Sequence, residues 1–84
     1  MKTELEIHFT PRELEIIKLI LLRCIRREIA FHLDIADGTV DGHIKHLYLK
    51  TGTHSVIELT FFLLDNGFSV DRDTMTVTYN GRII

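Results

Sequence analysis

Apolar residues recur with a helical period through the middle of this chain and with a period of two at its ends. Within residues 10–23, Leu14, Ile17 and Leu21 are spaced i, i+3 and i+7, which predicts a helix with one buried face. The same pattern continues further along the chain. Four helices are predicted, over about residues 11–23, 26–33, 37–50 and 56–66.

Short polar motifs mark where these helices begin and end. The sequence TPRE at residues 10–13 can form a capping box, and its proline suits a first helical turn. Ser55 and Glu58 have the same spacing at the start of the fourth helix. Gly52 and Gly67 follow the third and fourth helices, where glycine readily adopts the left-handed backbone that ends a helix.

Both ends of the chain alternate apolar and polar residues, as half-buried strands do. Residues 3–9 and 74–79 show this pattern, and Asn80-Gly81 favours a type I′ hairpin turn that returns residues 82–84 as a partner strand. A two-stranded ribbon is only marginally stable, so a third strand is needed. We expect the N-terminal strand to join the C-terminal hairpin in a small antiparallel sheet that covers Leu19, Leu21 or Leu22.

Length and composition indicate one small domain. The chain has 84 residues, 45% of them apolar, and no apolar run is long enough to span a bilayer. The N-terminus lacks a signal-peptide pattern and Cys24 is the only cysteine, so we expect a cytoplasmic protein without disulfides. A single domain is therefore expected over 1–84, with a helical core over 9–66 and terminal strands over 1–9 and 68–84.

The charge of the chain gives little support to nucleic-acid binding. The formal net charge is −2, residues 26–54 carry equal numbers of acidic and basic side chains, and residues 55–84 carry more acids. Any affinity for DNA must therefore come from the local placement of charge, because the overall field does not attract a polyanion.

Three motifs within residues 10–50 belong to one known pattern: TPRE at 10–13, EIA at 28–30, and Thr39-Val40 followed by His43. On these motifs the chain resembles the LuxR/FixJ-type helix-turn-helix domain over about residues 9–64. The resemblance implies a mainly α, four-helix fold, here extended by the terminal β-ribbon. It also implies a bacterial transcription regulator that binds duplex DNA as a dimer, with the third helix in the major groove.

The same resemblance suggests which residues meet DNA. Lys45 and Gly42 would face base edges, since lysine can donate to guanine O6 and N7 and glycine permits close approach. Arg27, His43 and Lys50 would contact the phosphate backbone. The alternative is that these side chains are simply the solvated polar face of a helical domain. The candidate DNA-binding residues are Arg27, Thr39, Asp41, Gly42, His43, Lys45, His46 and Lys50.

Several positions depart from the family pattern. Asp41 stands where the family usually has lysine, and a carboxylate there repels phosphate unless it accepts from cytosine N4. Arg23 replaces the usual glycine at the end of the first helix, and Ile25 and Ala36 replace serine caps. Thr51 replaces a leucine near the end of the third helix. These changes bear on DNA affinity rather than on the fold.

The fourth helix resembles the family's dimerisation helix and is apolar nearly all round. A surplus apolar face on it is a candidate homodimer surface, for which we name Leu59, Phe62 and Leu63. The alternative is that this surface is buried under the C-terminal hairpin.

No pattern in the sequence supports catalysis, a metal or a cofactor. His43 and His46 lie one helical turn apart, but no further ligand completes a metal site. Cys24 has the context of a small core residue rather than of a redox sensor. Neither a phosphate-binding glycine loop nor a nucleophile with a spaced base is present, so the protein is not expected to be an enzyme.

The sequence therefore predicts a sequence-specific duplex-DNA-binding transcription regulator with its recognition helix at about 37–50. Without a receiver or ligand-binding domain, its activity would be constitutive, set by abundance or controlled by a partner. The alternative is a protein-interaction module, such as an anti-activator that pairs with a related regulator through the fourth helix. Asp41, the acidic balance and the excess apolar surface favour that second interpretation.

Overall fold

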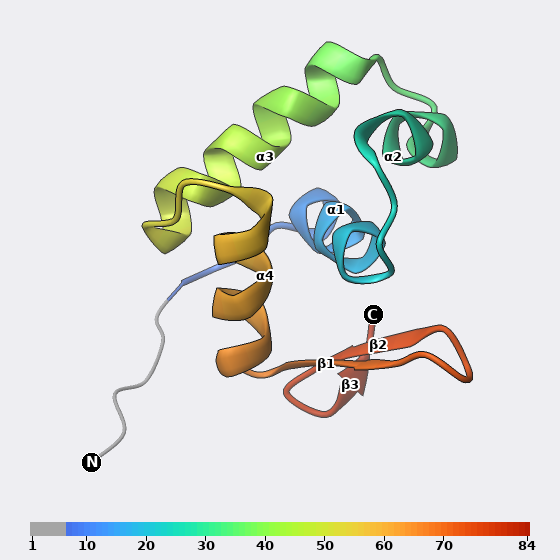
Figure 1. Cartoon of the computed structure of the whole chain (residues 1–84), viewed down its shortest axis with the longest axis vertical. Helices are drawn as coiled ribbons and strands as arrows, with labels where there is room; N and C mark the ends of the chain where they lie inside the picture. Colours follow the sequence, from blue (N-terminus) through green and yellow to red (C-terminus); the bar gives the residue numbers. More distant parts are fainter. Residues whose placement is uncertain (1–6) are drawn as a thin grey trace.

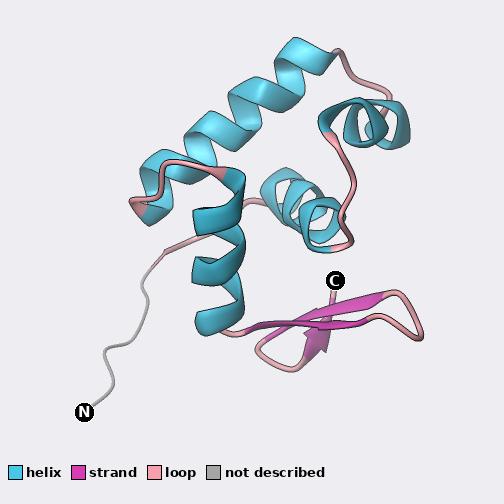
Figure 2. Ribbon diagram, in the orientation of Figure 1, coloured by secondary structure: helices cyan, strands magenta, loops and turns pink. Residues whose placement is uncertain are grey.

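A computed structural model describes residues 7–84 of the chain. Four helices are followed by a small antiparallel sheet, and the sheet lies at the opposite end of the molecule from α3 (Figures 1 and 2). This is the predicted mainly α class. The elements are α1 (Pro11–Leu21), α2 (Arg26–Leu33), α3 (Asp37–Thr51), α4 (Val56–Asp65), β1 (Phe68–Asp71), β2 (Thr76–Tyr79) and β3 (Arg82–Ile83).

The start of α1 is the capping box that the sequence predicts. The Glu13 N–H donates to Thr10 Oγ1 at 3.1 Å, and the Thr10 N–H donates back to Glu13 Oε1 at 2.9 Å. Two of the orphan donors of the first turn are thereby satisfied.

Helix α1 ends earlier than expected, at Leu21 and not near residue 23. Arg23 adopts a left-handed backbone with φ of 69°. Its N–H donates to Ile20 O, and the Cys24 N–H reaches back to Leu19 O, both at 2.9 Å. This pair of bonds is a Schellman motif, in which the left-handed position usually holds glycine.

The turn between α2 and α3 begins at Asp34, which also has a left-handed backbone. The Ile35 N–H donates to Ala30 O at 3.0 Å, and the half-buried Ile35 packs against the core. Ala30 itself is buried, as its small side chain predicts. The fully buried residues of the helical core are Ile16, Ile17, Ile29, Val40, Leu47, Leu59 and Leu63.

The sheet has the strand order β1-β2-β3, and each strand pairs with the next along the chain. Val70 lies opposite Val77, and Thr78 opposite Ile83. Asn80 and Gly81 both have positive φ, 53° and 85°, as the type I′ turn requires. The predicted C-terminal hairpin is confirmed.

The predicted N-terminal strand is wrong where the structure can test it. Residues 1–6 lie outside the described residues, and residues 7–9 form no strand. The third strand is instead β1, at the start of the C-terminal segment 68–84. Phe9 is nevertheless buried against the sheet. Its ring packs edge to face on the rings of Phe68 and Tyr79, with centroid distances of 5.8 and 6.0 Å.

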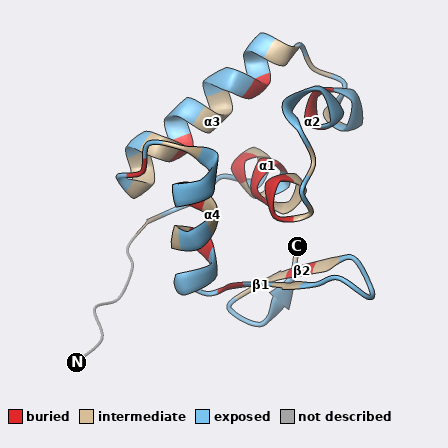
Figure 3. Ribbon diagram, viewed as in Figure 1, coloured by how far each residue is buried: buried red, intermediate tan, exposed pale blue. Residues whose placement is uncertain are grey.

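The sheet completes the core beneath α1 and α4 (Figure 3). Phe68 and Val77 are buried in the same apolar cluster as Leu21, while Leu19 and Leu22 are partly buried against it. The expectation that the sheet covers this end of α1 is therefore met. Within residues 7–84, none of the helices is both long and apolar enough to cross a membrane.

Candidate nucleic-acid interface

The outer face of α3 points away from the rest of the molecule and is exposed (Figures 1 and 3). Val40 and Leu47 are fully buried on its inner side. Because a helix advances about 100° per residue, the opposite side carries Gly42 and Lys45, both of which are exposed. The same outer side also carries Gly38 and Leu49.

The two glycines leave bare backbone on this face. A Cβ atom added to Gly38 or Gly42 would meet no atom of this chain within 4 Å. Glycine inside a helix costs about 1 kcal/mol relative to alanine, so the fold itself gains nothing from Gly42. A surface without side chains lets another molecule approach the helix closely.

Asp41 does not present an uncompensated negative charge. Its Oδ2 accepts from Nη1 of Arg26 on α2 at 2.8 Å, and Nε of the same arginine lies 3.8 Å from Asp37 Oδ2. These side chains are about half exposed, so the pairs contribute no more than about 1 kcal/mol to stability. Their main effect is on the local charge, because Arg26 partly neutralises the carboxylates of Asp37 and Asp41 at the start of α3.

Glu13 forms a second charge cluster at the other end of α3. Its side chain is buried, with Oε1 accepting from Lys50 Nζ at 2.6 Å and Oε2 lying 3.0 Å from His46 Nδ1. Burial alone would raise the pKa of this carboxyl group. Hydrogen bonds from Lys50, the Thr10 N–H and His46 outweigh that effect and lower the pKa to about 2.

This cluster fixes two of the predicted DNA-binding residues against α1. Lys50 Nζ also donates to the carbonyl of His8 at 2.7 Å, and its side chain is only 23% exposed. The His46 side chain remains 61% exposed although Nδ1 faces Glu13. By helical spacing His43, which is half-buried, lies on the same flank of α3.

The remaining candidates are more open. Arg27, at the start of α2, and Lys45 are exposed, and neither has an ion-pair partner in the part of the chain that the structure describes. Thr39 is exposed in the first turn of α3. The structure thus places Gly42 and Lys45 on the open outer face, with Thr39 on the flank of His43 and His46. Asp41 is paired with Arg26, and Lys50 with Glu13.

Sequence reasoning missed Arg26 and Leu49. Arg26 matters only because it reaches α3, and the sequence does not give the distance between two helices. Leu49 is 77% exposed and lies seven residues after Gly42, so helical spacing alone places it on the outer face.

The predicted dimer surface must be corrected. Leu59 and Leu63 are fully buried inside the protomer, and Phe62 is half-buried, so the first two cannot form an exposed face. The exposed apolar residues of α4 include Ile57, Phe61 and Leu64, which are spaced i, i+4 and i+7. When nearly every position of a helix is apolar, the sequence does not show which face is buried. For this reason the predicted dimer surface included the buried residues Leu59 and Leu63.

The described residues were also compared with metal-binding and nucleophilic sites. Among residues 7–84 no group of three or more His, Cys, Asp or Glu could hold a metal ion. Cys24 is partly buried against the core, and burial together with the nearby charge of Glu28 raises the pKa of its thiol. A thiol held in its protonated form is a poor nucleophile.

Comparison with known proteins agrees with this geometry. The family model described as "Bacterial regulatory proteins, luxR family" matches residues 8–63. This chain belongs to the LuxR family. The expected family resemblance over about residues 9–64 is therefore confirmed.

Relatives of this LuxR-family chain include three regulators. A probable transcriptional regulator, ycf29, of Cyanophora paradoxa is 34% identical over 62 residues, and the response regulator Rre1 of Synechocystis sp. is 34% identical over 65. These alignments cover 74% and 77% of this chain, but 30% and 28% of those proteins. The nitrate/nitrite response regulator NarL of Escherichia coli is 43% identical over 49 residues, covering 58% of this chain and 23% of NarL.

A solved structure is similar as well. The crystal structure of a Vibrio cholera VqmA-ligand-DNA complex superposes with a TM-score of 0.69 at 31% identity. The match covers 77% of this LuxR-family chain and 28% of that one. The chain therefore spans less than a third of the length of each of these proteins.

Proposed function

We propose that this LuxR-family chain is a transcription regulator that binds duplex DNA through α3. The observation that carries the proposal is the open, glycine-lined outer face of α3 in a helix-turn-helix chain of this family. The similar VqmA structure is of a complex that contains DNA. A helix presented in this way can enter the major groove, which is wide enough to admit it.

Within this proposal the residues have separate tasks. Lys45 and Thr39 donate to base edges or phosphate, and Gly42 lets the backbone of α3 approach the groove floor. Arg27 contacts phosphate from α2. Asp41 is paired with Arg26, so its charge opposes the phosphates less than an unpaired carboxylate would.

The small number of unpaired Lys and Arg side chains among the candidate DNA-contact residues sets the expected salt dependence. Arg27 and Lys45 each neutralise one phosphate, which gives a slope of about −2 per protomer in a plot of log affinity against log salt. Lys50 is already paired with Glu13, so it adds little to this slope.

Fluorescence anisotropy of a labelled duplex, titrated across salt, tests the DNA proposal. We expect binding at low salt that weakens as salt rises, and a loss of about 5-fold or more for Lys45→Ala. Arg82→Ala is the matched control, because Arg82 is exposed in β3 at the opposite end of the molecule. Equal losses for both variants would mean that α3 is not the contact surface.

We also propose that α4 pairs two copies of the chain through Ile57, Phe61 and Leu64. Two copies related by a twofold axis would bury the same stripe on each side and present two α3 helices to successive major grooves. We expect Phe61→Glu to shift the mass measured by light scattering from dimer to monomer and to weaken DNA binding. A wild-type protein that remains monomeric at high concentration would contradict this pairing while leaving groove binding by one protomer intact.

A second function has an observation of its own. Phe31 on α2 is 83% exposed, and with Leu49 it adds apolar surface to the helix-turn-helix where a DNA-facing protein gains little from it. This favours a protein-interaction module that pairs with a related regulator. Mixing with a purified full-length LuxR-type regulator distinguishes the two: a heterocomplex that lacks DNA affinity supports the interaction module, and unaltered mass contradicts it.

A further inference from the structure

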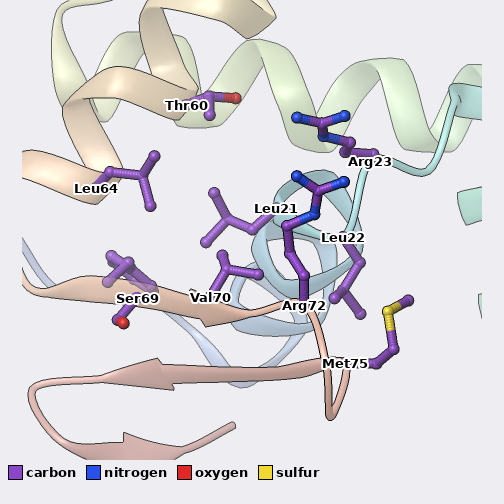
Figure 4. A pocket seen from close by; sticks show the side chains of 10 residues that line it. Leu21, Leu22, Arg23, Thr60, Leu64, Ser69, Val70, Arg72 and Met75 are labelled. Carbon is purple, nitrogen blue, oxygen red and sulfur yellow. The ribbon is translucent and has the colours of Figure 1, made fainter.

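A pocket of about 650 Å³ lies where the end of α1, the end of α4 and the sheet meet (Figure 4). Its walls are mainly apolar: Leu21 and Leu22 come from the α1 end, Leu64 from α4, and Phe68 and Val70 from β1. The family match stops at residue 63, so the strand side of the pocket is built from residues outside it. A pocket of this volume is in the range that holds a small ligand.

Two arginines give the pocket a positive side. Arg23 and Arg72 line it, and Figure 4 shows their guanidinium groups on the same side of the apolar walls. Neither arginine has an ion-pair partner among residues 7–84. No Asp or Glu is among the residues that line the pocket, so its charged side chains are both cations, and a bound anion would be attracted to them.

Arg23 also has a backbone conformation that is unfavourable for a residue with a side chain. Arg23 occupies the left-handed position of the Schellman motif, with φ of 69°, where glycine carries no penalty and a side chain does. The chain thus keeps a positive charge at the pocket at some cost in folding stability. Strain of this kind is expected where a side chain has a role outside the fold.

We propose that this pocket binds a soluble amphiphilic anion, a medium-chain carboxylate. The carboxylate lies between Arg23 and Arg72, which can each donate two parallel hydrogen bonds, and the alkyl chain fills the apolar walls. This site is separate from α3. It adjoins the proposed pairing surface, because Leu64 contributes to both.

Titration of the ¹⁵N-labelled protein with decanoate, followed by amide chemical shifts, tests the proposal. We expect saturable shifts confined to residues around 21–24, 60–64 and 68–75. Affinity should rise by up to about 4-fold per methylene from hexanoate to decanoate until the pocket is filled. Acetate, which has the head group alone, and decyltrimethylammonium, which has the tail with the opposite charge, should cause no saturable shift.

Variants separate binding from folding. Arg23→Gly should raise the Tm by about 4 °C, because it removes the left-handed strain, and should still weaken decanoate about 10-fold or more. Arg72→Gln should weaken it similarly, and Arg82→Gln, in the same sheet but outside the pocket, should not. A decanoate affinity unchanged by Arg23→Gly would overturn the proposal.

Two further outcomes would also overturn it. Without ligand, concentration-dependent shifts that reach Phe68, Val70 and Arg72, beyond the α4 pairing surface, would show that a second copy of the chain occupies the groove. Shifts produced only by anionic lipid vesicles would show surface adsorption. DNA binding by α3 is measured separately, so failure of either proposal leaves the other distinguishable.

Discussion

Glu13 caps its own helix and at the same time joins α1 to the C-terminal half of α3. The capping part could be predicted from the sequence because its partners lie within four residues of one another. The contacts with His46 and Lys50 could not, since they join residues 33 and 37 positions apart. Lys50 was predicted only as a phosphate contact, and the structure adds its ion pair with Glu13.

The lowered pKa of Glu13 makes a prediction about acid stability. Its folded-state pKa of about 2 lies below the ordinary value of 4.5, so its contribution is complete above pH 4.5 and is lost as pH falls toward 2. The loss amounts to about 3 kcal/mol of unfolding free energy. Urea unfolding at pH 5 and pH 2 should show a smaller decrease for Glu13→Gln than for the wild type. Identical decreases would contradict the assignment.

The pair formed by Arg26 and Asp41 makes a prediction about DNA affinity. Arg26→Gln exposes the charge of Asp41 and should weaken DNA binding about 5-fold, while Asp41→Asn should strengthen it by a similar factor. The double variant should return close to the wild type. If Asp41→Asn weakens binding instead, Asp41 accepts a hydrogen bond from a base.

At the scale of the element, the helices could be predicted well and the strands only in part. α1 and α4 begin at side-chain caps, Thr10 and Ser55, whereas α2 and α3 begin without one and were predicted from their apolar spacing. The turn at Asn80-Gly81 is encoded within two residues. The third strand could not be assigned, because residues 3–9 and Phe68–Asp71 are both compatible with an edge strand. β1 follows α4 directly and pairs with the next segment of chain, and local pairing of this kind closes a shorter loop.

The outer face of α3 gives a prediction in which stability and binding change in opposite directions. Gly42→Ala meets no atom of the chain and removes a helix-interior glycine, so the Tm should rise by about 4 °C. The added methyl group should nonetheless weaken DNA binding, because it keeps the helix away from the groove. Calorimetry and anisotropy on the same sample measure both. Unchanged affinity would place the closest approach elsewhere on α3.

At the scale of the whole molecule, the sheet belongs to the same core as the helices. Val77 is fully buried and Phe68 almost so, within the cluster that also contains Leu59 and Leu63. The alternation of residues 74–79 predicted a half-buried strand, which agrees with buried Val77, but Met75 of the same alternation precedes β2 and is exposed. The phase of α4 could not be, since nearly every position on it is apolar.

One shared core implies one unfolding transition. Val77→Ala removes two buried methyl groups and should lower the unfolding free energy by about 2 kcal/mol. Because the helices depend on the same core, their circular dichroism signal should melt at a correspondingly lower temperature. Thr74→Ala, in the exposed turn, is the control. A helical transition unaffected by Val77→Ala would show that the sheet unfolds as a separate unit.

The charge pairing on α3 has a consequence for how the protein would find its target in a chromosome. Arg26 and Lys50 are paired with Asp41 and Glu13, so under the proposed function Arg27 and Lys45 are left to attract DNA of arbitrary sequence. Non-specific affinity arises almost wholly from phosphate contacts, and a genome offers millions of competing sites. A regulator with few such contacts is sequestered less by random DNA, and so stays available to its operator at low copy number.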